Sequence, residues 1–577
     1  MPEEDSDEEH EDDEDDPAPP PKKKRKAKKP AEKKRKWERK TDIQVDPLPS
    51  FVHPNPSCIR SPFEYFQDMF TVDLLEDIVY QTNLYARQRN VNTAFHTDKH
   101  EIMVFIGIVL YMGVLQLPAI EDYWATYTRV AQVADAMSSK RFRLLRSFLH
   151  FNNNENCTSS TDRFFKIRPI FASLVRQFLK VKPTPTQSVD EVMVAYKGTR
   201  AGNLRQYIKT KPDKWGCKLF CRASIDGFIH DILMYQGETT FSSHHTQLNE
   251  EESELPVSSK TVIVLSKTLK TSSEVAIYAD NYFTSINLVE YLKDKMNCRY
   301  VGTARVNRIG DPPLISTKDL DKKEVPRGKY DYSSSDGGVL ALRWKDNKIV
   351  TVLSSDAGVN PVNTVKRYDK AEKKKVDVPC PNVIREYNGK MGGIDKSDML
   401  THLYKTPMRG RRWYLRLFGY ALDLCLCNAW IIYKRDCKAL GEKPMALKIF
   451  RLDISRFARC QKAMVSRITR TSPEGPMMIP RRGQRVQLPP DHRRYDSSKP
   501  HMPTFVNNRQ TCKYCSTKND LHRTRWMCDV CQVALCLSDT RNCFKPFHVP
   551  PATATATAEP SSPSTSAPSP STSATSP

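Results

Sequence analysis

The spacing of apolar residues divides the middle of the chain into a helical part and a part rich in strands. Between about residues 61 and 180, apolar residues recur every three or four positions, as in helices that bury one face. The pattern predicts helices over residues 63–70, 72–87, 100–115, 138–149 and 171–179. Pro183 and Pro185 end this region, because proline lacks the backbone N–H that continues a helix.

From Val189 onward the apolar residues alternate with polar ones, which is the period of β-strands. Asp226-Gly227 separates two such runs and is typical of a tight hairpin turn. The runs predict strands over 218–224, 228–235, 276–279 and 300–306, and a helix over 285–296. A strand, a hairpin, a strand, a helix and a strand in this order predict an α/β mixed sheet with a covering helix.

The segment 309–381 interrupts this pattern with short predicted strands and a lysine-rich run, 370–375. Helices are predicted to resume at Met391 and to continue over 413–433. The segment is therefore predicted to be an inserted β-rich domain. No apolar stretch reaches the ~18–20 residues that cross a bilayer; the longest, 102–117, contains two glycines and predicts a buried helix.

Charge is the next informative property. Lys and Arg number 90 against 67 Asp and Glu, a net charge of +23, which favours a polyanionic partner such as nucleic acid. Residues 1–16 are mostly acidic and residues 21–40 mostly basic, and such charged blocks are expected to be disordered. The compact cluster Lys22-Lys23-Lys24-Arg25-Lys26 is typical of a nuclear import signal, and a solvated tail that contacts DNA is a compatible alternative.

Three aspartates stand out for their local settings. Asp190 lies within a predicted strand, Asp280 follows the strand 276–279, and Asp395 lies in a glycine turn that opens a helix. Carboxylates held on neighbouring strands and an adjacent helix can bind two Mg²⁺ ions for phosphoryl transfer. Two structural alternatives remain: Asp190 pairs with a lysine, and Asp280 only caps the turn before Thr284.

Four blocks of sequence resemble the piggyBac transposase family in order and spacing: Ser188-Val189-Asp190-Glu191, Ala279-Asp280-Asn281-Tyr282-Phe283-Thr284-Ser285, Val301-Gly302-Thr303-Ala304-Arg305 and Gly392-Gly393-Ile394-Asp395-Lys396-Ser397-Asp398. The resemblance covers about residues 60 to 550. It implies an RNase H-like core with catalytic, Mg²⁺-binding Asp190, Asp280 and Asp395, and Asp398 as a fourth carboxylate. It also implies a nuclear homodimer that cuts DNA at element ends and inserts them at TTAA sites through hairpin intermediates.

Trp413 matches a tryptophan that the family places near the hairpin end. An aromatic ring beside cations can stack on an unpaired base, so Trp413, Arg411 and Arg412 are candidate DNA contacts. The alternative is that Trp413 is a core residue at the start of a helix.

The end of the chain carries a strong metal signal. Pairs of cysteines two residues apart are typical of tetrahedral zinc sites, and two closed sites need eight ligands. The candidates are Cys512, Cys515, His522, Cys528, Cys531, Cys536, Cys543 and His548, with His522 proposed to complete the set. In the family this module reads terminal DNA. The basic neighbours Lys513, Arg523, Arg525 and Arg541 favour that role, while the spacing leaves a RING- or PHD-like module open.

These patterns and the resemblance give a predicted domain order. It is a disordered tail (1–60), a helical dimerisation and DNA-binding domain in two parts (61–185 and 405–470), a catalytic core in two parts (186–308 and 382–404), an insertion (309–381), a Pro- and Arg-rich linker (471–510), a zinc-binding domain (511–549) and a disordered Ala/Thr/Ser/Pro tail (550–577). The leading hypothesis is a cut-and-paste transposase. The alternatives are a domesticated derivative that binds DNA or chromatin without cutting, and an ordinary RNase H-like nuclease.

Overall fold

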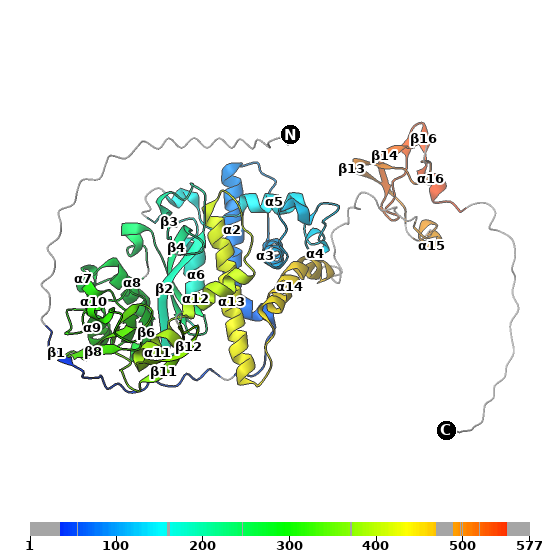
Figure 1. The fold of residues 1–577 in the computed structure, drawn as a ribbon. Helices are drawn as coiled ribbons and strands as arrows, with labels where there is room; N and C mark the ends of the chain where they lie inside the picture. The colour runs from blue at the N-terminus through cyan, green and yellow to red at the C-terminus, as the bar shows by residue number, and fades with distance from the viewer. Residues whose placement is uncertain are drawn as a thin grey trace, which may run out of the picture. The chain divides into compact units, whose positions relative to one another are not determined.

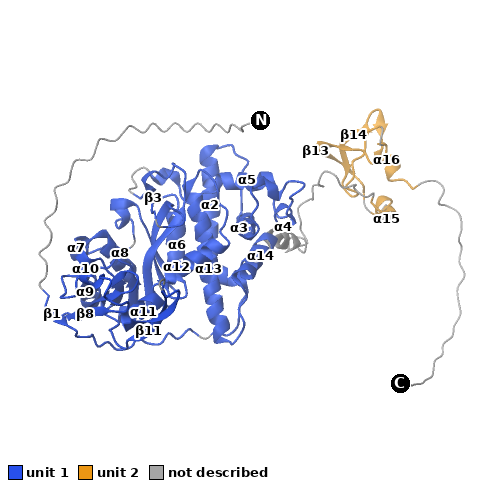
Figure 2. Ribbon diagram, viewed as in Figure 1, with its two compact units in different colours: residues 1–472 blue, residues 473–577 orange. Residues whose placement is uncertain are grey.

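The chain forms two compact units, residues 1–472 and 473–577, shown in different colours in Figure 2. The computed structural model describes residues 35–468 and 489–550, apart from 55, 158–161, 210, 245, 370–371, 497, 499 and 518–519. The predicted import signal, Lys22 to Lys26, and the tail from 551 lie outside the described residues.

The first unit contains a ten-stranded mixed sheet (Figure 1). Its strands, in spatial order, are β1 (Trp37–Arg39), β8 (Tyr330–Ser335), β9 (Leu340–Lys345), β10 (Ile349–Ser354), β7 (Arg299–Thr303), β6 (Ala276–Ala279), β2 (Thr186–Ala195), β4 (Trp215–Ser224) and β3 (Arg205–Tyr207), with β5 (Ile229–Met234) also paired to β4. The neighbours β2, β6 and β7 run parallel, and the remaining pairs are antiparallel. This mixed sheet confirms the predicted α/β class.

The helix between the parallel strands β6 and β7 is α9 (Ile286–Met296), where the sequence pattern predicted one. Ser285 caps it by accepting a hydrogen bond from the Leu288 N–H, which satisfies a donor that the first turn leaves unpaired. Its apolar face and α8 (Val257–Ser266), which the sequence analysis did not predict, share one core with the sheet.

A second core joins helices from both ends of this unit. The predicted helices are α1 (Pro62–Met69), α2 (Val72–Arg89), α3 (Lys99–Val114), α5 (Ser139–Phe148), α6 (Arg168–Phe178) and α13 (Trp413–Ala439), to which the structure adds α14 (Leu447–Ile468). Contrary to the expectation that no apolar stretch reaches this length, α13 is long and apolar enough to cross a membrane, yet most of it is buried among these helices and the sheet. The other described α-helices of this unit are α4 (Ala131–Ala134), α7 (Glu250–Ser253), α10 (Thr317–Leu320), α11 (Asn382–Lys390) and α12 (Gly393–Leu403).

A buried ion pair joins α14 to α13 and α3. The Arg451 guanidinium donates to Asp423 Oδ1 at 2.8 Å and to the Leu110 carbonyl at 2.9 Å, and both charged side chains are 2% exposed. Thr406 donates its hydroxyl to the same carboxylate at 2.6 Å. Gly113 leaves the room for this network, because a Cβ there would lie 2.4 Å from an Arg451 nitrogen.

Residues 35–60 depart from the prediction of a disordered tail. Strand β1 (Trp37–Arg39) pairs with β8. The Asp42 carboxylate accepts a hydrogen bond from the Val359 N–H at 2.8 Å. Further along, His53 Nε2 lies 2.6 Å from Asp436 Oδ1 on α13. Each contact joins residues hundreds of positions apart, so local charge in the sequence could not reveal it.

The predicted insertion, 309–381, also differs from expectation. Strands β8, β9 and β10 lie within it, yet they continue the central sheet through the pairing of β10 with β7. The part that forms a separate sheet is the hairpin of β11 (Asn363–Asp369) and β12 (Lys374–Cys380). The boundary at residue 309 therefore does not separate two sheets.

The second unit is small. Its elements are α15 (Asp491–Arg494), β13 (Pro503–Thr511), β14 (Arg523–Cys528), β15 (Leu537–Ser538), β16 (Arg541–Asn542) and α16 (Phe544–Phe547). Strand β13 pairs with β14, and the Arg494 guanidinium donates to the Phe547 carbonyl at 2.9 Å. Residues 491–510, predicted as linker, therefore belong to the folded module.

We expect Arg451→Met to lower the free energy of unfolding by about 3–5 kcal/mol, because Asp423 would be left buried and charged. Chemical denaturation of the full chain, followed by circular dichroism, measures this. The matched control is Arg456→Met on the same helix, since Arg456 pairs with Asp453 at the surface with 76% of its side chain exposed. A change below about 1 kcal/mol is expected there. Equal effects for the two variants would contradict a special role for the buried pair.

Candidate active site and metal centres

The parallel pairing of β2 with β6 brings the first two aspartates together. Val189 on β2 lies opposite Ala279 on β6, so the next residues, Asp190 and Asp280, follow at the same level of the sheet. Asp280 also accepts a hydrogen bond from the Tyr282 N–H at 2.9 Å. The capping role considered for Asp280 is therefore present together with its position beside Asp190.

Helix α12 supplies the other two carboxylates. Asp395 lies in its first turn and Asp398 one turn further on, so both lie on one side of the helix. The helix approaches the sheet closely at Gly393, where a Cβ would lie 2.5 Å from the Ser224 carbonyl oxygen and 2.6 Å from Ser188 Oγ. Only glycine permits this approach, which brings the start of α12, with Asp395 and Asp398, beside β2 and β4.

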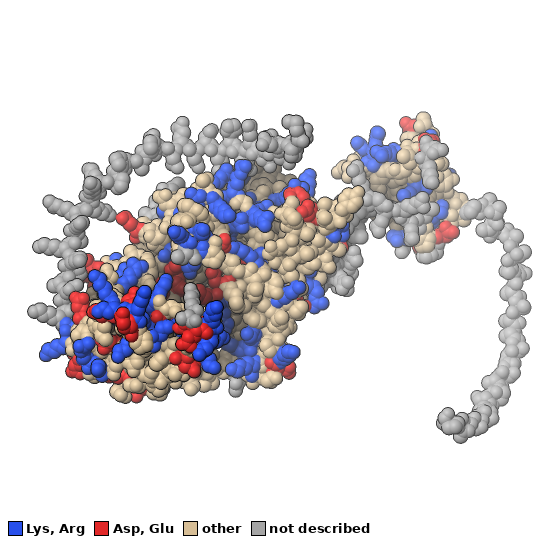
Figure 3. Space-filling model, viewed as in Figure 1, with Lys and Arg blue, Asp and Glu red and all other residues tan. Residues whose placement is uncertain are grey.

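Burial and neighbouring carboxylates destabilise the charged form of the aspartates in this site. Burial, chiefly, raises the pKa of Asp190 to about 7, and the nearby Glu191 and Asp280 carboxylates add to the rise. Burial likewise raises the pKa of Asp280 and of Asp398. On the face drawn in Figure 3, acidic atoms gather in a hollow over β2 and α12, with basic side chains around it.

These residues fit a divalent cation. Asp398 Oδ1 is buried and accepts no hydrogen bond from the described residues, with His402 Nδ1 3.7 Å away, so this oxygen is suited to Mg²⁺. A bound cation would offset the effect of burial on the pKa values, because it stabilises the charged carboxylates. Asp190, Asp280 and Asp395 remain the predicted ligands, with Asp398 beside them.

Lys211 is a feature of this site that the sequence analysis missed. Its ammonium donates to the Glu191 carbonyl at 3.1 Å and lies 3.8 Å from Glu191 Oε1. Burial alone would lower the pKa of Lys211, but the carboxylates around it, first Asp190 and Glu191, outweigh burial and raise that pKa. Lys211 therefore interacts electrostatically with Asp190, while its hydrogen bond goes to Glu191.

The three predicted DNA contacts near α13 differ in their surroundings. The Arg412 guanidinium donates to the carbonyls of Ser147 and Arg146, each at 2.8 Å, so it closes the end of α5. Trp413 is half-buried and packs edge-on against Phe164. Arg411 is the exposed one of the three. The packing of Trp413 at the start of α13 agrees with the alternative of a core residue, whereas the sequence did not reveal the contacts of Arg412.

In the second unit, one cluster consists of four cysteines. The sulfurs of Cys512, Cys515, Cys536 and Cys543 lie within 4.8 Å of one another. Burial would raise the pKa of the Cys512 thiol, but hydrogen bonds from backbone N–H groups, first that of Cys515, outweigh it and lower this pKa to about 7. A thiolate favoured in this way is suited to Zn²⁺.

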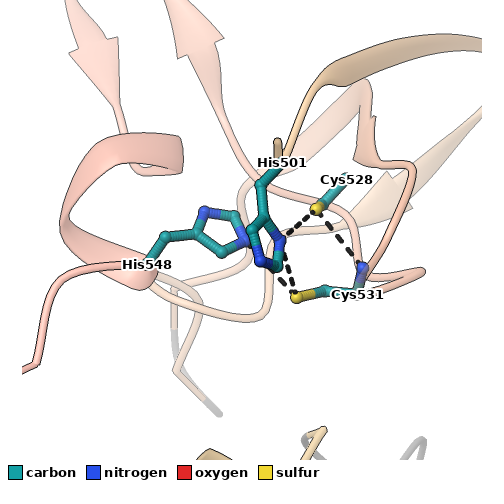
Figure 4. A group of neighbouring side chains, drawn as sticks. All are labelled: His501, Cys528, Cys531 and His548. Carbon is teal, nitrogen blue, oxygen red and sulfur yellow. Dashed lines mark hydrogen bonds between the residues drawn. The ribbon is translucent and has the colours of Figure 1, made fainter. Parts of the chain in front are cut away.

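A second cluster contains two histidines and two cysteines, His501, Cys528, Cys531 and His548, whose ligand atoms also lie within 4.8 Å of one another (Figure 4). His501 Nδ1 lies 3.3 Å from Cys528 Sγ, and His548 Nε2 lies 3.4 Å from Cys531 Sγ. The Nδ1–H of His548 donates to the Phe544 carbonyl at 2.8 Å, which leaves Nε2 free to bind a metal. Each cluster thus offers the four N and S ligands of a closed zinc site.

The prediction of His522 as the eighth ligand is wrong in this geometry. His522 Nε2 lies 2.9 Å from Asp520 Oδ2, and His522 is in neither cluster. His501 takes the position instead. It was missed because it precedes β13 in the segment predicted as linker, and its distance from the cysteines in the sequence carries no ligand spacing.

The basic side chains predicted to contact DNA lie on the surface of this unit. The exposed residues are Lys513, Arg523, Arg525 and Arg541. The Arg525 guanidinium also lies 5.9 Å from the centre of the Phe505 ring, which is itself exposed. Cations beside an exposed aromatic ring are common on protein surfaces that bind nucleic acid.

Comparison with known proteins identifies the family. Residues 61–430 match the family described as Transposase IS4. The human PiggyBac transposable element-derived protein 3 is 33% identical over 425 residues, which cover 72% of this chain and 68% of the relative. The chain belongs to the piggyBac transposase family.

Two further members support this placement. The human PiggyBac transposable element-derived protein 2 is 30% identical over 429 residues, covering 71% of this chain and 69% of that protein. A piggyBac transposase solved by cryo-EM in a synaptic complex with hairpin DNA has a TM-score of 0.59 and 22% identity, covering 83% of this chain and 95% of that one. The likeness confirms the RNase H-like fold.

We expect purified wild-type protein to hold about two zinc ions per chain, and His501→Ala to hold about one, because its site would lose a ligand. His522→Ala is the matched control and should retain both ions. Elemental analysis by mass spectrometry after dialysis measures the zinc content. Loss of zinc in the His522 variant, with retention in the His501 variant, would restore the original assignment.

The protonation of Asp190 should make the stability of the metal-free protein depend on pH. Without divalent metal, the folded chain holds a proton on Asp190 up to about pH 7, whereas an unfolded aspartate loses it near the ordinary value of 3.8. Stability of the metal-free protein should therefore fall as pH rises through this window. In EDTA at pH 8, we expect Asp190→Asn to be more stable than wild type by about 1–4 kcal/mol, and the difference should vanish near pH 4.

Urea denaturation at several pH values measures this difference. Asp294→Asn, at an exposed position on α9, is the control and should leave the stability nearly unchanged. Added Mg²⁺ should stabilise wild type more than Asp190→Asn, because ligand binding to the folded state shifts the equilibrium. An Asp190 variant that is less stable than wild type at pH 8 in EDTA would contradict the proposed strain.

Proposed function

We propose that this protein is a DNA transposase that excises an element and integrates it at TTAA sites by two-metal phosphoryl transfer. The observation that carries the proposal is the convergence of Asp190 and Asp280, at one level of two parallel strands, with the acidic turns of α12. Membership of a transposase family supports the same reaction class.

The main contribution of the protein is to hold the acidic side chains in fixed positions. Strands β2 and β6 lie in the core and α12 packs one face against it, so these elements hold the carboxylates against their mutual repulsion without rearrangement during the reaction. Bound Mg²⁺ would activate the attacking oxygen and stabilise the leaving oxygen of the DNA strand. The same site would serve strand cleavage, hairpin formation and strand transfer, because each step replaces one oxygen bonded to phosphorus with another.

Double-stranded DNA is the proposed partner. The net charge of +23 favours a polyanion, and exposed Lys373, Lys374 and Lys375 at the end of the β11–β12 hairpin add local positive charge. The structural neighbour was solved with hairpin DNA. We propose a homodimer that holds two element ends, acts in the nucleus and reads terminal repeats with the C-terminal zinc module.

The alternative is a domesticated protein that binds DNA without cutting it. The names of the human relatives favour this alternative, since both are described as derived from a transposable element. The four acidic positions are present in this chain, however, and Asp190 and Asp280 lie at one level of two paired strands. A binding role alone would gain nothing from carboxylates placed together, because each carboxylate repels the DNA backbone.

A cleavage assay separates the two functions. Its substrate is linear DNA that carries the genomic sequences flanking the coding region, each bordered by TTAA. With Mg²⁺, wild type should cut at the junctions, and Asp280→Ala should lower the rate by at least about 10³-fold, because a metal ligand is lost. Asp294→Ala, at the exposed position on α9, should cut like wild type.

Denaturing gels and an electrophoretic mobility shift assay read out cleavage and binding separately. Wild-type protein that binds this DNA but never cuts it, with Mg²⁺ or Mn²⁺, would favour the domesticated protein. Cleavage that persists in Asp280→Ala would place the reaction at another site.

A further inference from the structure

We propose that Lys211 is a further catalytic residue, whose ammonium binds a non-bridging oxygen of the scissile phosphate. This inference rests on the proposed function, because it assigns a role at the same acidic site. The acidic site repels the negatively charged DNA strand that it is proposed to cut. Several carboxylates repel a phosphodiester, so a fixed cation beside them is needed to hold the DNA strand there.

The loop that carries Lys211 is anchored at both ends. It connects β3 with β4, and its base is closed by a hydrogen bond from the Ile208 N–H to the Lys214 carbonyl at 2.9 Å. Asp213 ties the loop to the end of α12, with its carboxylate 3.1 Å from Lys405 Nζ and 3.4 Å from His402 Nε2. The helix that bears Asp395 and Asp398 therefore also positions the loop.

The ammonium of Lys211 retains donors for a ligand. Its hydrogen bond among the described residues goes to the Glu191 carbonyl at 3.1 Å, and the Glu191 carboxylate lies further away, at 3.8 Å. An ammonium group has three donors. The side chain is 22% exposed, so the group is restrained by the protein and still open to a substrate.

Neighbouring lysines are engaged elsewhere. Lys218 Nζ lies over the aromatic rings of Phe220 and Tyr282, at 4.5 and 4.7 Å from their centres, and burial lowers its pKa. Lys405 pairs with Asp213. Lys218 also interacts electrostatically with Glu191, Asp190 and Asp280. Lys211 differs from it in the hydrogen bond to the Glu191 carbonyl and in the donors that remain for a ligand.

A binding experiment tests the contact without requiring cleavage. In EDTA, so that no metal ion attracts the scissile phosphate, fluorescence anisotropy measures the affinity for a duplex that spans the junction of element end and TTAA, and for the same duplex with an uncharged methylphosphonate at the scissile position. Wild type should lose about tenfold in affinity on this neutral DNA, the effect of one charge-assisted hydrogen bond. Lys211→Met should lose less than about twofold, because its contact is already gone.

The controls separate contact from structure. Lys214→Met removes an exposed lysine of the same loop and should behave like wild type on both duplexes. Lys211→Arg should retain most of the sensitivity to the neutral DNA, because the charge is preserved. Equal losses for wild type and Lys211→Met would overturn the proposal, whatever the thermal stability of the variants.

The kinetic readout distinguishes this failure from failure of the proposed function. If wild type cuts, Lys211→Met should lower the single-turnover rate by about 10- to 100-fold, and Lys211→Arg should restore part of it. If wild type binds the junction but never cuts, transposition is rejected while the binding comparison still decides the role of Lys211. If wild type shows no difference between charged and neutral junctions, the contact is rejected.

Discussion

Carboxylates that must stay close together repel one another, and the first unit is organised around that constraint. Desolvation makes the problem worse, as the raised pKa values of Asp190, Asp280 and Asp398 show. Two parallel strands and a helix that contacts them through Gly393 resist the repulsion. The same crowding explains why a lysine lies in the site.

Rigid placement of the acidic strands depends on the helices around them. Helices from residues 62–178 pack with α13 and α14, so the sheet is inserted between two parts of one helical core. The Arg451–Asp423 pair lies where these parts meet and contacts the backbone of α3. A buried ion pair of this kind contributes more to the specificity of helix packing than to net stability, because its geometry admits few alternative packings.

The spacing of apolar residues correctly predicted elements that depend on neighbouring residues alone. The strand 276–279 and the helix 285–296 agree with β6 and α9 to within a residue, because alternation and capping are properties of short segments. The family blocks placed the four aspartates. The joining of β10 to β7, the pairing of β1 with β8, and the positions of Lys211 and His501 depend on contacts between distant residues. No short-range pattern carries that information, so His522 was chosen in place of His501.

The pairing of β1 with β8 has a consequence for synthesis of the chain. Trp37 lies opposite Ser335, so the first strand to leave the ribosome waits for nearly three hundred later residues before it finds its neighbour. The early helices likewise wait for α13 and α14. Apolar faces of α1 and α3 therefore stay uncovered through most of translation, when exposed surface favours aggregation. The nascent chain is therefore most exposed to aggregation until residues near 460 have been made.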